Sequence, residues 1–186
     1  QDNLGGLAAI ARKIEAQFDI KLNVISGGNS SSIYLIWKEG LPEGINNLRL
    51  GESFLLGNDT AYGETVPGCV HDTMTLEAQI IELKEKPSLP IGEVGVDAFG
   101  EKPYYEDRGM MKRAIIAVGK QDTDLGGMHP TDTQIEIMGG SSDHTILDVT
   151  HADKGYKVGD VVSFTLEYGA MLKLATSPYV EKAYIK

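Results

Sequence analysis

The chain has 186 residues and 41% hydrophobic content, which is enough for a packed core in one domain or two small ones and excludes a disordered chain. Its formal net charge is -10, from 27 acidic and 17 basic residues without a Lys or Arg cluster, which argues against nucleic acid and anionic membranes as partners. Cys69, the single cysteine, cannot form an internal disulfide, and no apolar run approaches the roughly 20 residues of a membrane helix. These features predict a cytoplasmic protein, and the start at Gln1 without a methionine leads us to expect a fragment.

The first part of the chain alternates predicted helices and short strands. From residue 4 to 18, apolar residues recur every three or four positions and polar residues fill the opposite face, which predicts an amphipathic helix. A strand is expected at 20–25, a second helix at 31–38 and a second strand at 45–50. This order predicts parallel α/β structure. Because so short a segment cannot close a barrel or a doubly wound sheet, we expect the end of a larger α/β domain.

The composition and periodicity of the sequence change after Gly57. Residues 58–72 are rich in Gly, Thr, Pro and Asp and show no periodicity, so we place a domain boundary there, with domains at 1–68 and 69–186. Beyond it, runs of β-branched or alternating apolar residues predict strands at 74–84, 113–118, 134–138, 145–149 and 160–166. The second domain is therefore expected to be an all-β unit of sandwich or barrel type.

A loop rich in glycine and serine separates the first predicted strand from the second predicted helix. In GGNSSS, residues 27–32, backbone N–H groups, hydroxyls and the positive end of a helix dipole meet at one place, which suits a phosphate. Asn and Ser are also the usual helix N-caps, and on its own chemistry the loop favours a capped turn over an anion site. Arg49, at the end of the next strand and just before Gly51, is either a solvated charge or a group that faces a cofactor ring or a carboxylate.

The second domain carries fewer candidate groups. Ser142 and Asp143 precede a predicted strand and could offer a backbone donor and a carboxylate to a polar substrate, although a turn with an Asx cap is the more common outcome. Tyr179, near the chain end, packs by its ring or reaches a ligand with its hydroxyl. The four histidines lack metal-ligand spacing and Cys69 lacks an activating neighbour, so we predict neither a metal site nor a cysteine nucleophile.

Several stretches resemble one family, in consistent order over nearly the whole chain: GGNSSS, LRLGE, PIGEVGVDAFG, GGSSDHTILDV, YKVGD and TSPYV. Together they resemble the C-terminal half of the alanine racemase family, and within it the ornithine racemase branch. The resemblance implies a pyridoxal 5'-phosphate (PLP) enzyme of fold type III. It also implies the C-terminal part of a TIM-type (β/α)8 barrel at 1–68, which binds the cofactor, and a β-domain of sandwich or barrel type at 69–186, which contributes to the active site.

The resemblance assigns roles in cofactor binding to five residues. Ser30 matches the serine that binds the cofactor phosphate, with Ser31 as a near neighbour. Gly51 and Glu52 occupy the places whose backbone also meets the phosphate. Tyr179 matches the tyrosine whose hydroxyl closes that site. Because of the resemblance, we expect the loop at 27–32 to bind the phosphate of PLP, although its own chemistry favours a capped turn.

The resemblance also assigns roles near the substrate. Arg49 matches the arginine that faces the pyridine nitrogen; an arginine keeps that nitrogen unprotonated and weakens the ring as an electron sink, which suits racemisation better than transamination. The related decarboxylases carry a glutamate at that place. Ser142 and Asp143 match residues that reach the substrate in the neighbouring subunit's site, which implies a head-to-tail homodimer.

Two catalytic groups of the family have no clear match. The Schiff-base lysine lies near the start of the barrel, so the missing N-terminal barrel half is an implied partner of this chain. The catalytic tyrosine follows a Gly-Glu pair; here Asp97 takes its place without gaps, and Phe99 takes it with a short insertion. Asp97 could be the second acid/base if burial raises its pKa, or it could bind the side-chain amine of a basic substrate. Tyr104 and Tyr105 are nearby substitutes.

The main hypothesis is an amino-acid racemase that interconverts L- and D-ornithine, or another basic amino acid, by two-base proton transfer at the α-carbon. Glu52, Asp97 and Asp143 motivate the basic substrate. The alternatives are a PLP-binding protein or fragment without turnover, and a fold-type-III amino-acid decarboxylase, which Arg49 disfavours.

Overall fold

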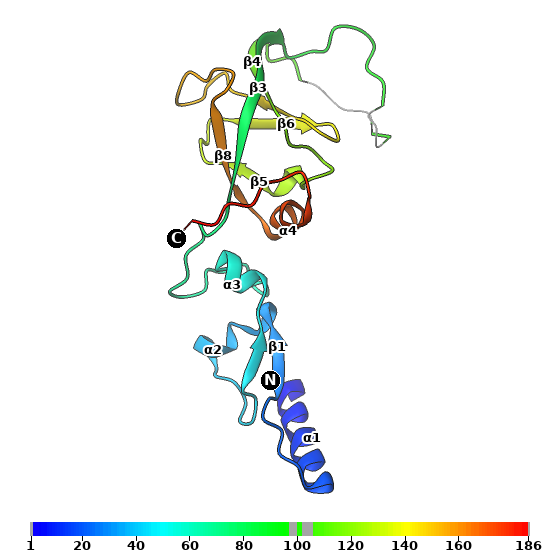
Figure 1. Ribbon diagram of the computed structural model, residues 1–186, viewed down its shortest axis with the longest axis vertical. Coiled ribbons are helices and arrows are strands. Elements are labelled where there is room, and N and C mark those ends of the chain that lie inside the picture. Colours follow the sequence, from blue (N-terminus) through cyan, green and yellow to red (C-terminus); the bar gives the residue numbers. More distant parts are fainter. Residues whose placement is uncertain (1, 97–99, 102–105, 186) are drawn as a thin grey trace. The chain divides into compact units, whose positions relative to one another are not determined.

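The computed structural model describes residues 2–96, 100–101 and 106–185, and the packing divides the chain into two units, Gln1–Thr73 and Met74–Lys186 (Figure 1). The division follows directly after the aperiodic segment at 58–72. Each unit is described by itself. The candidate acid/base Asp97 and its substitutes Phe99, Tyr104 and Tyr105 lie outside the described residues.

The first unit is a small α/β arrangement around a parallel pair of strands. Its elements are α1 (Asp2–Phe18), β1 (Ser26–Asn29), the 3-10 turn η1 (Ser30–Ser32), α2 (Leu35–Lys38), β2 (Asn47–Arg49) and α3 (Glu52–Leu56). The helical turns η1 and α2 lie in the crossover between β1 and β2, as a parallel pair requires. The parallel α/β expectation is therefore confirmed, and α1 confirms the predicted amphipathic helix.

The first predicted strand is wrong in position. It was expected at 20–25, but β1 begins at Ser26 and runs through both glycines of the serine loop. The backbone N–H of Ile25 donates to Oδ1 of the Asn46 side chain at 2.8 Å. It therefore does not bond to a backbone carbonyl of a neighbouring strand, as it would inside a sheet. A Cβ atom on Gly27 would lie 2.5 Å from Cγ2 of Ile45, so the glycine permits the close approach that lets the chain pair there.

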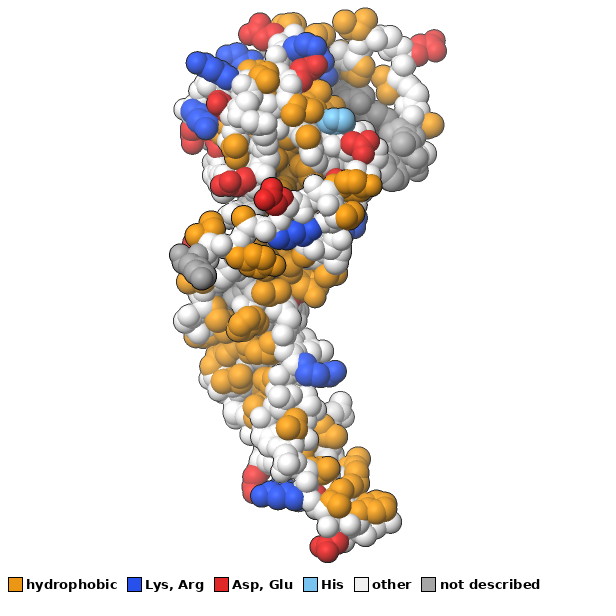
Figure 2. Space-filling view, in the orientation of Figure 1, with side chains coloured by type: hydrophobic (Ala, Val, Ile, Leu, Met, Phe, Trp, Pro, Cys, Tyr) orange, Lys and Arg blue, Asp and Glu red, His pale blue; other side chains and the backbone are white. Residues whose placement is uncertain are grey.

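Helix α1 leaves much of its apolar surface uncovered by the described residues. Ala8 and Ala11 are buried, with 3% and 4% of their surface exposed. The larger apolar side chains remain at least one-third exposed: Leu7, Ile10, Ile14 and Phe18. Figure 2 shows hydrophobic side chains gathered over the face of this unit. Such a large uncovered apolar surface is typical of a part that packs against further protein.

The second unit is a six-stranded antiparallel sheet with one helix. The strand order is β5-β8-β3-β4-β7-β6. The elements are β3 (Thr75–Pro87), β4 (Met110–Ile116), η2 (Leu125–Gly127), β5 (Met128–Pro130), β6 (Glu136–Gly140), β7 (Thr145–Asp148), β8 (Val161–Leu166) and α4 (Tyr168–Thr176). All five strands expected from the sequence are confirmed with shifted ends, whereas β5 and α4 were not predicted.

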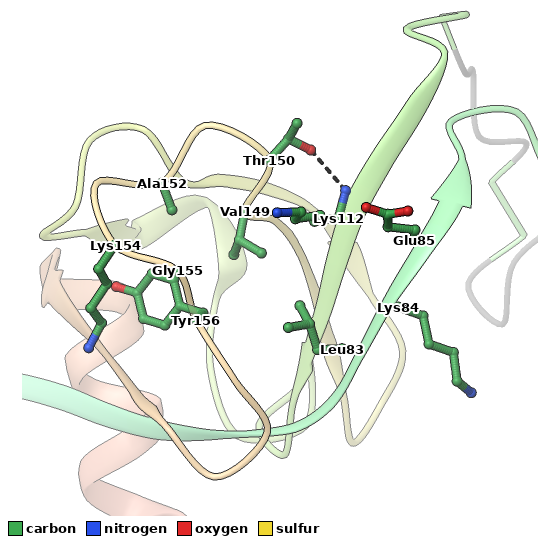
Figure 3. A pocket seen from close by; sticks show the side chains of 10 residues that line it. All are labelled: Leu83, Lys84, Glu85, Lys112, Val149, Thr150, Ala152, Lys154, Gly155 and Tyr156. Carbon is green, nitrogen blue, oxygen red and sulfur yellow. Dashed lines mark hydrogen bonds between the residues drawn. The ribbon is translucent and has the colours of Figure 1, made fainter.

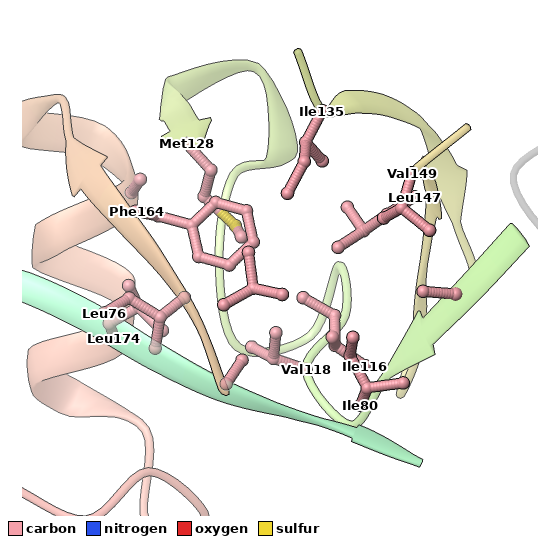
Figure 4. Close-up of a cluster of buried hydrophobic side chains, with 14 residues drawn as sticks. Leu76, Ile80, Ile116, Val118, Met128, Ile135, Leu147, Val149, Phe164 and Leu174 are labelled. Carbon is pink, nitrogen blue, oxygen red and sulfur yellow. The ribbon is translucent and has the colours of Figure 1, made fainter. Parts of the chain in front are cut away.

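The sheet curls around a single hydrophobic core (Figure 4). Phe164 on β8, Ile80 on β3, Ile116 on β4 and Leu147 on β7 are all 1% exposed or less. At the two edges, β6 meets the turn that leads into β5, because a Cβ on Gly140 would lie 2.9 Å from Cδ1 of Leu125. The sheet is therefore nearly closed, which confirms an all-β unit of barrel type.

None of the helices in the described parts of the chain is long and apolar enough to cross a bilayer.

Candidate functional site

The ends of β1 and β2 bring polar residues together in the first unit. The two strands run parallel and Asn29 pairs in register with Arg49, so their C-terminal ends lie side by side. Oδ1 of Asn29 accepts hydrogen bonds from the backbone N–H of Ser31 at 2.9 Å and from the Ser31 hydroxyl at 2.7 Å. Asn29 is thus the N-cap of η1, which confirms the capped turn and leaves the hydroxyl of Ser30 to other partners.

The Ser30 hydroxyl faces the start of α3. Its Oγ accepts hydrogen bonds from the backbone N–H of Gly51 at 3.2 Å and of Ser53 at 3.3 Å. The Ser53 hydroxyl in turn donates to the Ser30 carbonyl oxygen at 3.3 Å. Two main-chain donors and one hydroxyl donor therefore converge on one place at the strand ends.

This donor set fits the phosphate of PLP. At 3.2 and 3.3 Å, the two N–H bonds to Ser30 lie at the long end of the N–H···O range, so the neutral hydroxyl holds these donors only weakly. A phosphate oxygen is a stronger acceptor, because charge-assisted hydrogen bonds are shorter and roughly twice as strong. Ser30 itself keeps a hydroxyl proton to donate.

Arg49 and Glu52 lie next to this place. Arg49, the last residue of β2, has an exposed side chain, and Glu52 opens α3 and is half-buried. The serine loop, Arg49 and the start of α3 are thus brought together by one strand pair. Sequence reasoning missed Ser53. Its signal was a hydroxyl residue directly after Gly51-Glu52, at the start of a helical run.

The second unit brings Tyr179 and the turn at 141–144 to one loop. Ser142 Oγ donates to Asp143 Oδ2 at 2.7 Å, and both residues are exposed. The loop 119–123 binds this turn, because Gln121 donates its backbone N–H to the Ser142 carbonyl at 3.0 Å. From the same loop, Oδ1 of Asp122 accepts the Ser177 hydroxyl at 2.7 Å.

Tyr179 follows this buried pair and is 80% exposed. Its backbone N–H donates to Ser177 Oγ at 3.1 Å. It borders a shallow depression of about 270 Å³ lined by Gln121, Asp122, Lys173, Thr176, Ser177, Pro178 and Tyr179. The exposed phenol is available to a ligand, whereas Asp122 and Ser177, which sequence reasoning missed, gave no local signal because they are 55 positions apart.

Another depression of the second unit, about 280 Å³, holds none of the predicted site residues (Figure 3). Leu83, Val149 and Tyr156 contribute to its lining. The pKa of the Tyr156 phenol is raised, first by burial and then by nearby carboxylates including Asp132 and Asp160. The candidate site in the first unit is marked by its convergent hydrogen-bond donors.

In the described residues, no three His, Cys, Asp or Glu side chains come close enough to hold a metal ion. The predicted site residues that the structure describes thus fall into two sets, one in each unit. Ser30, Ser31, Arg49, Gly51 and Glu52 lie in the first unit, and Ser142, Asp143 and Tyr179 lie in the second.

No protein-family model matches the chain. Among curated relatives, an ornithine racemase of Acetoanaerobium sticklandii is 59% identical over 181 residues, covering 97% of this chain and 51% of that protein. A lysine racemase of Thermotoga maritima is 45% identical over 179 residues, covering 96% of this chain and 50% of that protein. The chain therefore spans about half the length of the curated relatives it matches.

Solved structures share its fold. An alanine racemase from Bartonella henselae with covalently bound pyridoxal phosphate has a TM-score of 0.55 at 22% identity, covering 95% of this chain and 46% of that chain. An alanine racemase from E. faecalis has a TM-score of 0.51 at 15% identity, over 89% of this chain and 44% of that chain. These matches confirm the expected fold class, α/β structure followed by an all-β domain.

Proposed function

We propose that this chain, whose resemblance to the alanine racemase family and its ornithine racemase branch is confirmed, is the C-terminal half of a PLP-dependent amino-acid racemase. The observation that carries the proposal is the convergence of the Ser30 hydroxyl with the N–H groups of Gly51 and Ser53 at two parallel strand ends. The curated relatives named as racemases match nearly the whole chain and support the reaction class.

The first unit holds the cofactor phosphate. Ser30 would donate its hydroxyl to a phosphate oxygen, and the main-chain N–H groups of Gly51 and Ser53, which now donate to Ser30 Oγ, would donate to phosphate oxygens. Ser31 and Glu52 flank this cradle, one held by Asn29 and the other at the start of α3. When bound, PLP supplies an electron sink that makes the α-proton of an amino acid acidic.

Arg49 sets the chemistry. It ends β2 in register with Asn29, beside the phosphate cradle. By the family resemblance, its guanidinium would face the pyridine nitrogen of bound PLP. A guanidinium stays protonated and donates only, so the nitrogen that it meets stays unprotonated. Bound PLP would then be a weaker electron sink, which favours return of the proton to the α-carbon. This is the reason to prefer racemisation over decarboxylation or transamination.

The second unit completes two different sites. By the family resemblance, Tyr179, whose phenol is exposed, would donate to the cofactor phosphate. Ser142 and Asp143, exposed on their turn, reach the substrate in the site of the other subunit of a head-to-tail homodimer. One β-domain thereby serves the two active sites.

The missing half of the protein completes the barrel. The uncovered apolar side chains of α1, including Ile10 and Phe18, support packing against further barrel elements, because 56% and 63% of their surface is exposed. That half also supplies the Schiff-base lysine, which is one acid/base group. For the second acid/base we propose Asp97, which takes the place of the family's catalytic tyrosine in the ungapped sequence; its other possible role is to bind the side-chain amine of the substrate.

The substrate is ornithine or another basic amino acid. The two curated relatives are named for ornithine and lysine, which both carry a side-chain amine. Asp143 and Glu52 supply carboxylates for such an amine. Without a membrane-crossing helix in its described part and with a net charge of -10, the chain fits a cytoplasmic enzyme.

The complete protein, reconstituted with PLP, tests the proposal. We expect the protein to convert L-ornithine into a mixture of both enantiomers, which chiral chromatography measures. Lysine is the second substrate to be assayed. Absence of inversion for any amino acid while PLP is retained would favour a PLP-binding protein without turnover. Release of carbon dioxide would favour the decarboxylase.

A further inference from the structure

A buried carboxylate in the second unit is joined to the segment that carries Tyr179. Asp122 is 5% exposed and Ser177 is 7% exposed, so both polar side chains are withdrawn from water. Their hydrogen bond of 2.7 Å spans 55 positions of sequence. Burial of a carboxylate costs free energy unless strong partners compensate, so this contact is one that the fold maintains at a cost.

The Ser177 hydroxyl has two partners and therefore one orientation. Its proton goes to Asp122 Oδ1, and its oxygen accepts the backbone N–H of Tyr179 at 3.1 Å. The backbone of Ser177 is also held, because its N–H donates to the Lys173 carbonyl at 2.9 Å and its carbonyl accepts Lys182 Nζ. Asp122 thereby fixes the hydroxyl that fixes the backbone of Tyr179.

The loop that carries Asp122 is itself fixed. Lys120 and Gln121 donate their backbone N–H groups to the carbonyls of Ser141 and Ser142 at 2.9 and 3.0 Å. A Cβ on Gly119 would lie 2.4 Å from the Ser142 carbonyl oxygen, so the two segments touch through their backbones. Tyr179 is thus positioned against the same loop that positions the turn at 141–144.

We propose that Asp122 and Ser177 are positioning residues, which set the affinity for PLP by holding the backbone at Tyr179 so that its phenol meets the cofactor phosphate. The inference rests on the proposed function. Both side chains are buried, so we assign neither of them a contact with the cofactor. An exposed phenol on an unheld backbone would lose conformational entropy on binding, and the buried pair removes that loss before the cofactor arrives.

The affinity of the complete apoprotein for PLP, titrated by absorbance, tests this. Ser177→Ala removes both hydrogen bonds of the hydroxyl and is expected to weaken PLP binding by about tenfold, because bonds to a buried charged group are among the stronger ones. Asp122→Ala should do the same, and Asp122→Asn, which keeps an oxygen acceptor, should recover much of the affinity. Thr176→Ala is the matched control, because its hydroxyl donates only to the carbonyls of Leu172 and Lys173.

A double-variant cycle separates positioning from general stability. If Ser177 acts through Tyr179, the pair Ser177→Ala and Tyr179→Phe binds PLP about as weakly as Tyr179→Phe alone. Fully additive losses overturn the inference, as does a native affinity for Ser177→Ala. If Tyr179→Phe has no effect while Ser30→Ala still weakens PLP binding, the inference fails and the proposed function stands. If neither affects PLP binding, both fail.

Discussion

The hydroxyl oxygen of Ser30 lies 3.2 Å from the backbone nitrogen of Gly51, 21 positions further along the chain. The contact joins the end of β1 to the start of α3, because β1 and β2 are parallel neighbours. It makes a hydroxyl and main-chain donors converge where a phosphate oxygen can replace the serine oxygen.

Removal of the Ser30 hydroxyl should weaken PLP binding. We expect Ser30→Ala to raise the dissociation constant of the complete apoprotein for PLP by about tenfold, the worth of one charge-assisted hydrogen bond. Thr131→Ala is the control, since its hydroxyl donates to the Ser163 carbonyl in the second unit and is not among the proposed cofactor-binding residues. Absorbance titration measures both; equal losses would contradict the assignment of the phosphate to Ser30.

Replacement of Arg49 should change the reaction and not only the rate. Arg49→Glu places a carboxylate where a pyridine nitrogen would become protonated, which strengthens the electron sink. We expect slower racemisation, and we expect a larger share of turnovers to convert the cofactor to its amine form. Chiral chromatography measures the racemisation and absorbance measures the amine form. Arg49→Lys, which keeps a positive charge, is the control. An unchanged product ratio in Arg49→Glu would count against the role of Arg49.

Mixed dimers test whether the two sets of residues serve different subunits. Ser30→Asp should exclude the phosphate by like charge, and Asp143→Lys should repel a basic substrate. Each variant alone should be nearly inactive. After subunit exchange, heterodimers contain one intact site, so activity should rise to about a quarter of wild type. No recovery after demonstrated exchange would exclude the head-to-tail arrangement.

Gly119 should tolerate no side chain. A Cβ would lie 2.4 Å from the Ser142 carbonyl oxygen and 2.6 Å from the His144 nitrogen, and backbone atoms cannot turn away. We expect Gly119→Ala to lower the free energy of unfolding by about 1–3 kcal/mol. Gly155→Ala, with nothing within 4 Å, should be close to neutral. Denaturant unfolding of the complete protein measures both, and equal stabilities would refute the close approach.

Glu82 should contribute stability only where it is ionised. Its pKa lies below the ordinary value of 4.5, because hydrogen bonds from Lys84 and then Lys86 favour the carboxylate. A pKa lowered by folding adds stability above the unfolded-state pKa and loses it as the pH falls through the folded-state pKa. The Glu82→Gln variant should therefore be less stable than wild type at about pH 7. Well below about pH 4 the two proteins should be equally stable.

The effect of Glu82 should be small, since the ion pair is solvent-exposed, and high salt should reduce it. Glu77→Gln on the same strand is the control for loss of one carboxylate. A difference between wild type and Glu82→Gln that persists in acid would contradict the ion-pair explanation.

The sequence by itself determined the elements whose signal is local. The apolar spacing in residues 4–18 predicted α1, and alternation at 160–166 predicted β8, because each pattern reflects the period of one element against one core. The order of short motifs also identified the family resemblance and with it Ser30, Arg49 and Tyr179 as candidates.

The tertiary structure alone decided where the strand and the polar contacts lie. The strand expected at 20–25 moved to Ser26–Asn29, because pairing depends on the room between Gly27 and Ile45. The convergence on Ser30 depends on parallel pairing, and the contact of Asp122 with Ser177 depends on a curled sheet that returns α4 to the loop after β4. Both contacts join residues that are far apart in the sequence, so local sequence patterns do not predict them.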